Sequence, residues 1–292
     1  MSHLFTNSVD TNLSISGIFS NSHFKRVFEN GSSDYIDKKT EKLQESTALN
    51  KKSTRKEVLE RMYSHLLNEY RCEYIYKNII TRKILLGKHS LNTSTLINEF
   101  RVGSSVADVV LINGKSTVYE IKTELDNHDR LQDQIADYQK AFLDIYIVVH
   151  HSEFDTYMQK LSDSTVGLIV LNKRNQLSVR KQAVSDADKL DITTMFKCLR
   201  KGEYSYIIIK AFGEVPDVSN MFYFKECLNL AKKMDAIEFN KMMGEELKKR
   251  KPKEKEIICS DSVPDFLRNI CLSIDPSKRE YERLFNYLNQ TV

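Results

Sequence analysis

The stretch Val118-Tyr119-Glu120-Ile121-Lys122 decides how this sequence is interpreted. It is an apolar run rich in β-branched and aromatic residues, which is typical of a β-strand, but one acid and one base interrupt it. Because successive side chains of a strand point to opposite faces, Glu120 and Lys122 share one face while Tyr119 points to the other. Burying such charges unpaired in an apolar sheet costs free energy. The pattern therefore predicts a functional site rather than packing alone.

A second acid, Asp108, lies twelve residues before Glu120 in another strand-like segment. Asn113-Gly114 stands between the two segments and is a strong hairpin signal. A plain two-residue turn would set Asp108 opposite Tyr119 and send the two acids to opposite faces of the sheet. We predict an odd loop or a bulge here instead, because it sets Asp108 opposite Glu120 and a metal site needs both acids on one face.

The periodicity of the surrounding sequence predicts an α/β fold with a mixed sheet. Apolar residues at helical spacing predict a helix over 54–70, with Ser53 or Thr54 as its N-cap. Residues 70–86 are undecided between helix and strand. From residue 93 the period changes to two, and the continuous apolar run 145–149 is typical of a central strand. The expected strands are 96–102, 106–112, 116–123, 145–149, 166–171 and 177–180, and a helix is expected over 127–142.

We expect three parts along the chain. Residues 1–52 form a polar extension, with a short helix near 23–29 and partial mobility over 30–50. Residues 53–185 form the α/β domain, and residues 186–292 form a helical domain that binds nucleic acid or a partner.

Composition and charge narrow the class of protein. The chain has 292 residues, 41% of them hydrophobic and 29% charged, which is typical of a soluble globular protein. Its net charge of +4 does not by itself identify a nucleic-acid binder. No secretory signal and no membrane-spanning run is recognisable, so a cytoplasmic location is expected. The five cysteines contain no CxxC pair, which predicts free thiols and no zinc site.

The acids and the base of these strands suit one kind of chemistry. Mg²⁺ and Mn²⁺ prefer oxygen ligands, which Asp108, Glu120 and the carbonyl group of Ile121 could supply. A water bound to such an ion loses its proton more easily and can attack phosphorus. Lys122 would orient that water or offset charge on the phosphate. These residues predict a metal site that hydrolyses phosphodiesters.

At these positions the chain resembles the PD-(D/E)XK nuclease superfamily, in which an acid on the second strand and an E-x-K triplet on the third form the site. Asp108 and Glu120-Ile121-Lys122 match that pattern. The segment Gln134–Tyr138 resembles the Q-x-x-x-Y element of bacterial RecB-type members, whose Gln and Tyr approach the metal or the DNA. Gly103–Asp108 resembles their glycine-containing approach to the acid. The resemblance covers residues 54–171 and implies a restriction-endonuclease-like sheet flanked by helices.

Several assignments stay open. A further acid often completes such sites, and Glu99, Glu73 and Glu69 compete for that role. Lys122 could instead pair with Glu124 or Asp126 at a strand end, and Tyr138 could be an ordinary core residue. His150-His151 closes a strand, but adjacent strand residues face opposite ways and do not readily bind one ion.

Basic residues offer contacts to a phosphate backbone. Arg130 lies one turn before Gln134 and could contact a phosphate or form a salt bridge with Asp126 or Asp133. The stretch 248–255 is strongly basic and is either a solvated helix end or a nucleic-acid contact. The residues nominated there for backbone contact are Lys248, Lys249, Arg250, Lys251 and Lys253.

The sequence therefore predicts a nuclease dependent on Mg²⁺ or Mn²⁺ that acts on DNA, in phage defence or mobile-element biology. The resemblance also implies at least a dimer. Two alternatives remain: a non-catalytic nucleic-acid-binding or regulatory module on the same fold, and an RNase or toxin. A site that reads phosphate does not separate DNA from RNA.

Overall fold

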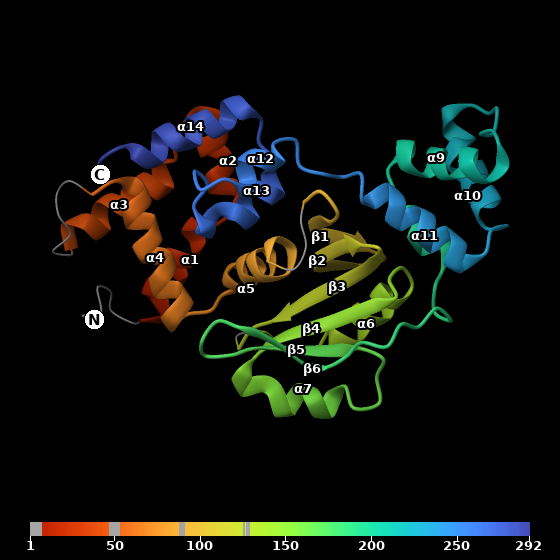
Figure 1. Cartoon of the computed structure of the whole chain (residues 1–292), viewed down its shortest axis with the longest axis horizontal. Helices are drawn as coiled ribbons and strands as arrows, with labels where there is room; N and C mark the ends of the chain where they lie inside the picture. The colour runs from red at the N-terminus through yellow and green to blue at the C-terminus, as the bar shows by residue number, and fades with distance from the viewer. Residues whose placement is uncertain (1–7, 47–52, 88–90, 125, 127–128) are drawn as a thin grey trace. The chain divides into compact units, whose positions relative to one another are not determined.

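The computed structural model describes residues 8–46, 53–87, 91–124, 126 and 129–292. The chain divides into two compact units (Figure 1). The sheet unit comprises Gly87–Lys251, and the helical unit comprises Met1–Leu86 together with Pro252–Val292. Each unit is described by itself.

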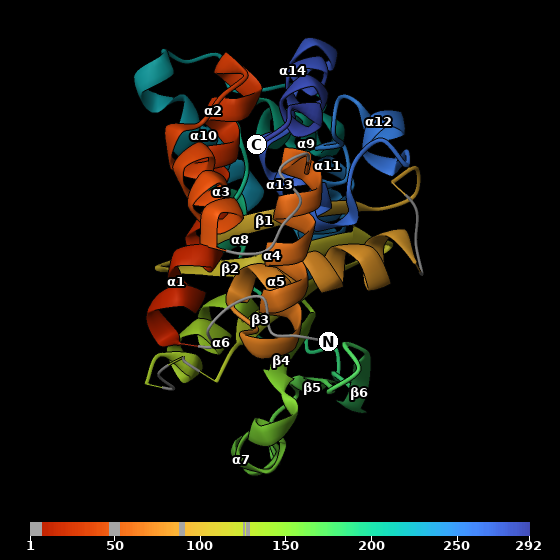
Figure 2. The same ribbon diagram turned by 90° about the vertical axis from the view of Figure 1, so that its left-hand side faces the viewer.

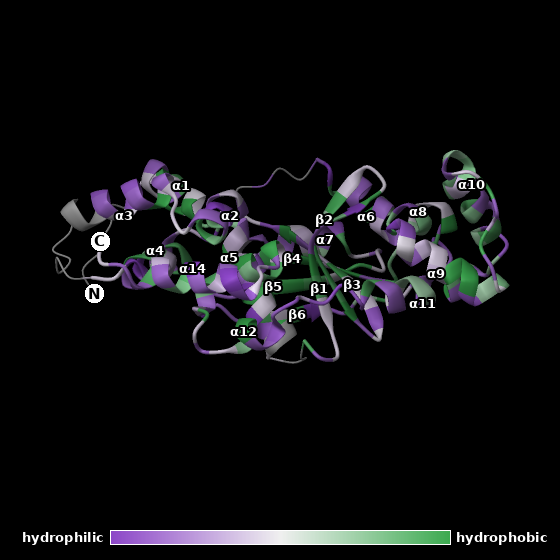
Figure 3. Cartoon of the chain, turned by 90° about the horizontal axis from the view of Figure 1, so that it is seen from above, coloured by the Kyte–Doolittle hydropathy of each residue, from purple (hydrophilic) through white to green (hydrophobic). Residues whose placement is uncertain are grey.

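The sheet unit is built on six strands in the order β1-β2-β3-β4-β5-β6. The first three strands are antiparallel, β3, β4 and β5 run parallel, and β6 returns antiparallel to β5. Hydrophobic residues dominate the inner strands β4 and β5 (Figure 3), as their burial requires, whereas the edge strand β6 is largely exposed. All six predicted strands are confirmed: β1 Thr95–Val102, β2 Ser105–Asn113, β3 Lys115–Lys122, β4 Asp144–His150, β5 Gly167–Leu171 and β6 Leu177–Lys181.

Helix α6 (Leu131–Gln139) connects β3 to β4, because a parallel pair of strands needs a crossover connection. Its residues Leu131, Ile135 and Tyr138 share one hydrophobic core with Val118 and Ile145 of the sheet. The core face of β3 is therefore the face that carries Glu120 and Lys122. The remaining helices of this unit are η2 His151–Glu153, α7 Phe154–Lys160, α8 Ile192–Lys197, α9 Lys201–Phe212, α10 Asn220–Ala231 and α11 Ala236–Leu247.

The structure groups the C-terminal helices differently from the expected three-part division. Phe196 of α8, together with Phe239 and Leu247 of α11, belongs to the same buried core as the sheet residue Val118. Helices α8–α11 thus complete the sheet unit, whereas residues after 251 belong with the N-terminal helices. The physical reason is burial, because the apolar sides of α8 and α11 are covered by the sheet and by its other helices.

In the described residues of the helical unit, every regular element is a helix (Figure 2). The undecided segment 70–86 is helical, and a helix of thirteen residues, α3, occupies much of the segment 30–50 expected to be mobile. The N-cap expected at residue 53 or 54 is Thr54, which forms a capping box with Glu57. The helices are α1 Val9–Ile18, α2 Asn21–Asn30, α3 Asp34–Ser46, α4 Arg55–Glu69, α5 Glu73–Ile80, the π-helix η1 Thr81–Leu86, α12 Lys255–Cys259, η3 Asp265–Leu267, α13 Arg268–Ile274 and α14 Lys278–Asn289.

The two chain segments of the helical unit are joined at the start of α4. Thr54 forms an isolated antiparallel bridge with Thr291. The guanidinium group of Arg55 donates to the carbonyl oxygen of Tyr287 (3.2 Å) and to Oε1 of Gln290 (2.7 Å). It also lies 3.1 Å from the Asp37 carboxylate. A buried guanidinium group needs such acceptors, so Arg55 ties α4 to the C-terminal helix.

The structure also bears on membrane-spanning helices and on the state of the cysteines. Over the described ranges, no helix combines the length and the apolar character that a membrane span requires. All five cysteines carry free thiols, as expected.

Replacing Arg55 tests the junction between the two segments. We expect Arg55→Ala to lower the free energy of unfolding by about 3 kcal/mol. The carbonyl group of Tyr287 and Oε1 of Gln290 lose their donor, and the half-buried Asp37 carboxylate, which still accepts from the Tyr287 hydroxyl group, loses its counter-charge. Lys25→Ala is the matched control, since Lys25 forms only an exposed pair with Glu29 and its loss should cost less than about 0.5 kcal/mol. Urea unfolding curves of the two variants measure the difference, and equal losses would contradict the assigned role.

Candidate functional site

The candidate site lies where strands β2 and β3 separate. Their paired register runs from Asn113 opposite Lys115 to Val109 opposite Tyr119, and only Gly114 stands between the first pair. Gly114 has φ of 71°, a left-handed conformation that favours glycine. Extending this register by one step sets Asp108 opposite Glu120. The expected odd turn is confirmed, because the observed register, if continued, is the one that pairs Asp108 with Glu120.

Beyond Val109 the two strands no longer form ladder hydrogen bonds, while β3 continues to pair with β4 as far as Lys122. We call this opening the fork. The side chain of Asp108 bridges it, because its Oδ2 atom accepts the backbone N–H of Ile121 at 2.7 Å. A carboxylate thus replaces the carbonyl group that a neighbouring strand would have supplied, and Asp108 is held against the E-x-K segment.

Glu120 is the centre of a hydrogen-bonded cluster, although its side chain is only 2% exposed. Its Oε1 atom accepts from Nζ of Lys122 (3.0 Å) and from Nε2 of Gln134 (2.6 Å). Nζ of Lys122 also donates to Oε1 of Gln134 (2.9 Å). The sequence left open that Lys122 pairs with Glu124 or Asp126 at a strand end. In the structure, Lys122 contacts Glu120 and Gln134 instead. The acid, the base and the amide therefore form a closed triangle.

Tyr138 adds a fourth member to this cluster from the same helix. Its ring is fully buried in the core, and its hydroxyl group lies 2.8 Å from Oε2 of Glu120 and 2.9 Å from the carbonyl oxygen of Val106. Burial raises the pKa of Tyr138 well above its usual value, and the Glu120 charge raises it further. The hydroxyl group therefore stays protonated and serves as a donor within the fork.

A second contact between α6 and the strands fixes the turn between β1 and β2. Oδ2 of Asp137 accepts hydrogen bonds from the backbone N–H of Ser104 (3.0 Å), from its hydroxyl group (2.8 Å) and from the Ser105 hydroxyl group (2.9 Å). Gly103 has φ of 60°, and a Cβ atom there would lie 2.8 Å from Oδ1 of Asp137. The turn can approach α6 this closely only because residue 103 has no side chain.

The pKa of Asp137 reflects these contacts. Burial raises the pKa of this carboxyl, but hydrogen bonds from Ser104, Lys140 and Ser105 outweigh burial and bring the pKa down to about 2. Asp137 is therefore charged across the physiological range. Neither Asp137 nor the two serines was singled out from the sequence. The signal that could have found them is the spacing of Gln134, Asp137 and Tyr138, which places all three on one helix face.

Glu99 is the strongest of the three expected further acids. Asn98 pairs with Val109 and Phe100 with Ala107, so the position between them sets Glu99 opposite Asp108. Glu99 is exposed and has φ of 54°, which is uncommon for a residue other than glycine. Such a conformation costs free energy and is concentrated at functional sites in proteins.

The other two expected acids belong to the helical unit, at the end of α4 and the start of α5. Both Glu69 and Glu73 are exposed, and Glu73 forms an ion pair with Lys77 at 2.6 Å. Their roles stay predictions. Arg130 is exposed at the N-terminus of α6, one turn before Gln134. Its contact with a phosphate stays a prediction.

The basic stretch after α11 is largely engaged within the protein. Arg250 forms a bidentate ion pair with Glu203 (2.6 and 2.7 Å), which gives it a structural role. Lys249 contacts Glu246 at 2.5 Å and lies over the ring of Tyr206. The remaining nominated residues are Lys248, whose carbonyl oxygen accepts from Thr95, Lys251, which donates to the carbonyl oxygen of Asn92, and Lys253, which pairs with Asp275. Their contact with nucleic acid stays a prediction.

The fork contains oxygen donors that could hold a hard divalent cation. Two carboxylates and one ammonium group leave one negative charge in excess, which a cation would neutralise. Over the described part of the chain, no three His, Cys, Asp or Glu side chains are grouped as a metal cluster. A cation would therefore depend on Asp108, Glu120 and neutral oxygens such as the Ile121 carbonyl group. Mg²⁺ is commonly held in this way, by one or two carboxylates with several waters.

Comparison with known proteins places the chain in a family. The family described as Bacteriophage P4 protein cII matches residues 67–263, more than half of the chain and the whole of the fork. This chain belongs to that family. Protein cII of Enterobacteria phage P4 is 27% identical over 140 residues, which are 47% of this chain and 49% of that protein. The chain thus spans about half the length of this relative. No solved structure matches.

Glycine substitutions test the contact between the turn and α6. We expect Gly103→Ala to destabilise the protein by at least about 1 kcal/mol more than Gly114→Ala. Both positions have positive φ and incur the same backbone strain, but only at residue 103 does the new methyl group meet Asp137. Thermal or urea unfolding measures the two losses, and equal values would show that the close approach does not matter.

The depressed pKa of Asp137 predicts how its contribution changes with pH. A carboxyl whose pKa is lower in the folded than in the unfolded protein stabilises the fold above its ordinary pKa, and this stabilisation is lost as the pH falls toward about 2. We expect Asp137→Asn to cost about 2 kcal/mol at neutral pH and distinctly less at pH values below about 3. Unfolding free energies of both proteins across this range give the difference. A cost that does not change with pH would contradict the assignment.

Proposed function

We propose that this protein is a metal-dependent nuclease that hydrolyses phosphodiester bonds of DNA. One observation carries the proposal: Asp108 accepts the backbone N–H of Ile121 at the fork, and Glu120, Lys122 and Gln134 contact one another there. Three antiparallel strands, a helix and a parallel strand follow in this order, which supports a restriction-endonuclease-like fold of the PD-(D/E)XK type.

The residues of the fork would divide the work as follows. Asp108, Glu120 and the carbonyl group of Ile121 would hold the cation. When bound, Mg²⁺ or Mn²⁺ would lower the pKa of a coordinated water and polarise the phosphate. Lys122 would stabilise the negative charge that builds on the phosphate oxygens during attack. Gln134 keeps that ammonium group in place, because it contacts both Lys122 and Glu120.

The reaction is a hydrolysis. The water oxygen forms a bond to phosphorus while the bond from phosphorus to the ester oxygen breaks. The proton released by the water ends on the departing oxygen, which leaves as an alcohol. A relative carried by a phage favours the proposed setting in mobile-element biology or phage defence. The resemblance further suggests that the protein acts as a dimer or a higher oligomer.

A second candidate is favoured by the closure of the cluster. Glu120 is buried, and its two oxygens already lie within hydrogen-bonding distance of Lys122, Gln134 and Tyr138. A non-catalytic nucleic-acid-binding module could use this arrangement purely for stability. Titration with Mn²⁺ separates the two functions, because the nuclease should bind the ion and Asp108→Asn should weaken binding. A module that binds DNA but no Mn²⁺ would support the second candidate.

Cleavage of supercoiled plasmid tests the nuclease directly. With Mg²⁺ or Mn²⁺, we expect the native protein to cut, and Lys122→Ala and Asp108→Ala to cut at least about a hundredfold more slowly. Lys115→Ala is the matched control, since Lys115 lies on the same strand but is exposed and should leave the rate unchanged. Unchanged cutting by the first two variants, with folding intact, would mean a different active centre or a contaminant.

The same assay with linear duplex, single-stranded DNA and RNA tests the substrate class. We expect cleavage of DNA. Cleavage of RNA alone would favour the other alternative, an RNase or a toxin.

A further inference from the structure

A second surface of the sheet unit exposes apolar side chains far along the chain from the fork residues. On α9, Ile209 and Phe212 are three residues apart and are 46% and 40% exposed. Tyr206, one turn earlier, is 49% exposed and carries Lys249 over its ring. At the start of α10, Met221 and Phe222 are 82% and 52% exposed. The two helices pack against each other. Single exposed apolar residues are ordinary, but a group on two adjoining helices is typical of an interaction site.

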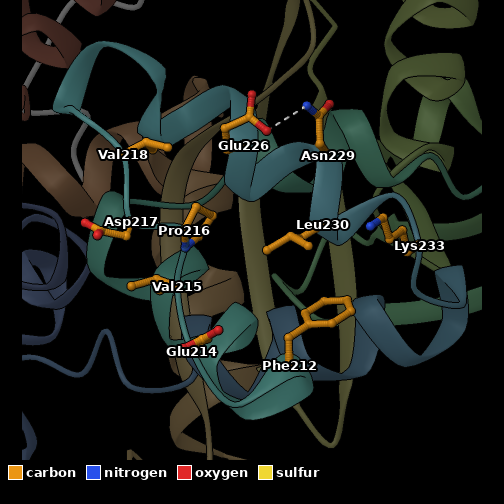
Figure 4. A pocket seen from close by; sticks show the side chains of 10 residues that line it. All are labelled: Phe212, Glu214, Val215, Pro216, Asp217, Val218, Glu226, Asn229, Leu230 and Lys233. Carbon is orange, nitrogen blue, oxygen red and sulfur yellow. Dashed lines mark hydrogen bonds between the residues drawn. The ribbon is translucent and has the colours of Figure 1, made fainter.

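A pocket of about 470 Å³ lies between the end of α9, the following loop and α10. The side chains of Phe212, Pro216 and Leu230 line it (Figure 4). This volume falls in the range of natural ligand sites and accommodates bulky apolar side chains. Phe212 belongs both to the exposed residues of α9 and to the pocket lining, so the pocket offers a concave anchor point beside them.

The charge of the pocket narrows the class of partner. Glu214, Asp217 and Glu226 line it, against a single base, Lys233. Among the residues that the structure describes, none of these three carboxylates forms an ion pair. An excess of negative charge repels the phosphates of a nucleic acid and attracts Lys and Arg.

The same charge argues against a second copy of this chain as the occupant. A twofold interface would place this patch against itself. It would then bring the acids of both copies together, and like charges in an interface are unfavourable.

We propose that this surface, defined by Ile209, Phe212, Met221, Phe222 and the pocket, docks a protein segment that presents apolar anchors flanked by Lys or Arg. An amphipathic helix has this chemistry and binds grooves through side chains at intervals of three and four residues. The apolar anchors enter the pocket, and the basic flanks face Glu214, Asp217 and Glu226. The surface is independent of the proposed nuclease site, so the test below does not depend on catalysis.

A labelled synthetic helix with Leu on one face and Lys on its flanks serves as the probe. The comparison peptide carries Glu in place of every Lys. We expect the full chain to bind the Lys peptide at least about tenfold more tightly, as measured by fluorescence anisotropy, and to lose affinity as salt increases. Similar affinity for both peptides would overturn the proposal.

Two variants locate the binding. Glu214→Lys combined with Asp217→Lys should lower the affinity for the Lys peptide about tenfold, and Phe222→Ser should also weaken it. Glu256→Lys reverses a charge elsewhere, on a 77% exposed side chain, and should have no effect. An equal loss with Glu256→Lys would place the binding elsewhere and overturn the proposal. So would self-association in sedimentation equilibrium that Phe222→Ser abolishes, because the occupant would then be a second copy.

Discussion

The burial of the Glu120 carboxylate is the constraint on which the arrangement of the sheet unit depends. A charged oxygen removed from water needs donors, and strand pairing satisfies only the backbone of Glu120, not its side chain. Lys122 comes from the same strand, while Gln134 and Tyr138 come from α6. Helix α6 can therefore neither slide nor rotate on the sheet without leaving Glu120 unsatisfied. The hydrophobic core allows a range of helix positions, but this carboxylate selects one.

Helix α6 also supplies contacts to the start of β2, where β2 no longer pairs with β3. The residues of β2 that precede Val109 form no ladder with β3. The carbonyl group of Val106, one of them, accepts from the Tyr138 hydroxyl group. Asp137 holds the preceding turn through its contacts to Ser104 and Ser105. One face of one helix thus stabilises the opened strand pair. The opening leaves the Asp108 carboxylate beside the E-x-K segment, where the proposed metal site requires it.

Much of the sheet could be predicted because it depends on local pattern. Alternating apolar residues or, at 145–149, a continuous apolar run marked the strands, and the parity of the turn around Gly114 followed from requiring Asp108 and Glu120 on one face. The division into units was not predictable in this way, because it depends on contacts between distant segments, such as Phe239 and Leu247 with Val118. Asp137 escaped notice for the same reason, since its partners lie 32 and 33 residues earlier in the sequence.

The pairing of Thr54 with Thr291, and of Arg55 with Gln290, makes the helical unit discontinuous in the chain. This has a consequence for biosynthesis. All of the sheet unit has emerged from the ribosome once residue 251 has emerged. Helices α1 to α5, in contrast, lack their partners until residues 252–292 are translated. The sheet unit can therefore fold during translation, while the N-terminal helices wait with apolar surface uncovered.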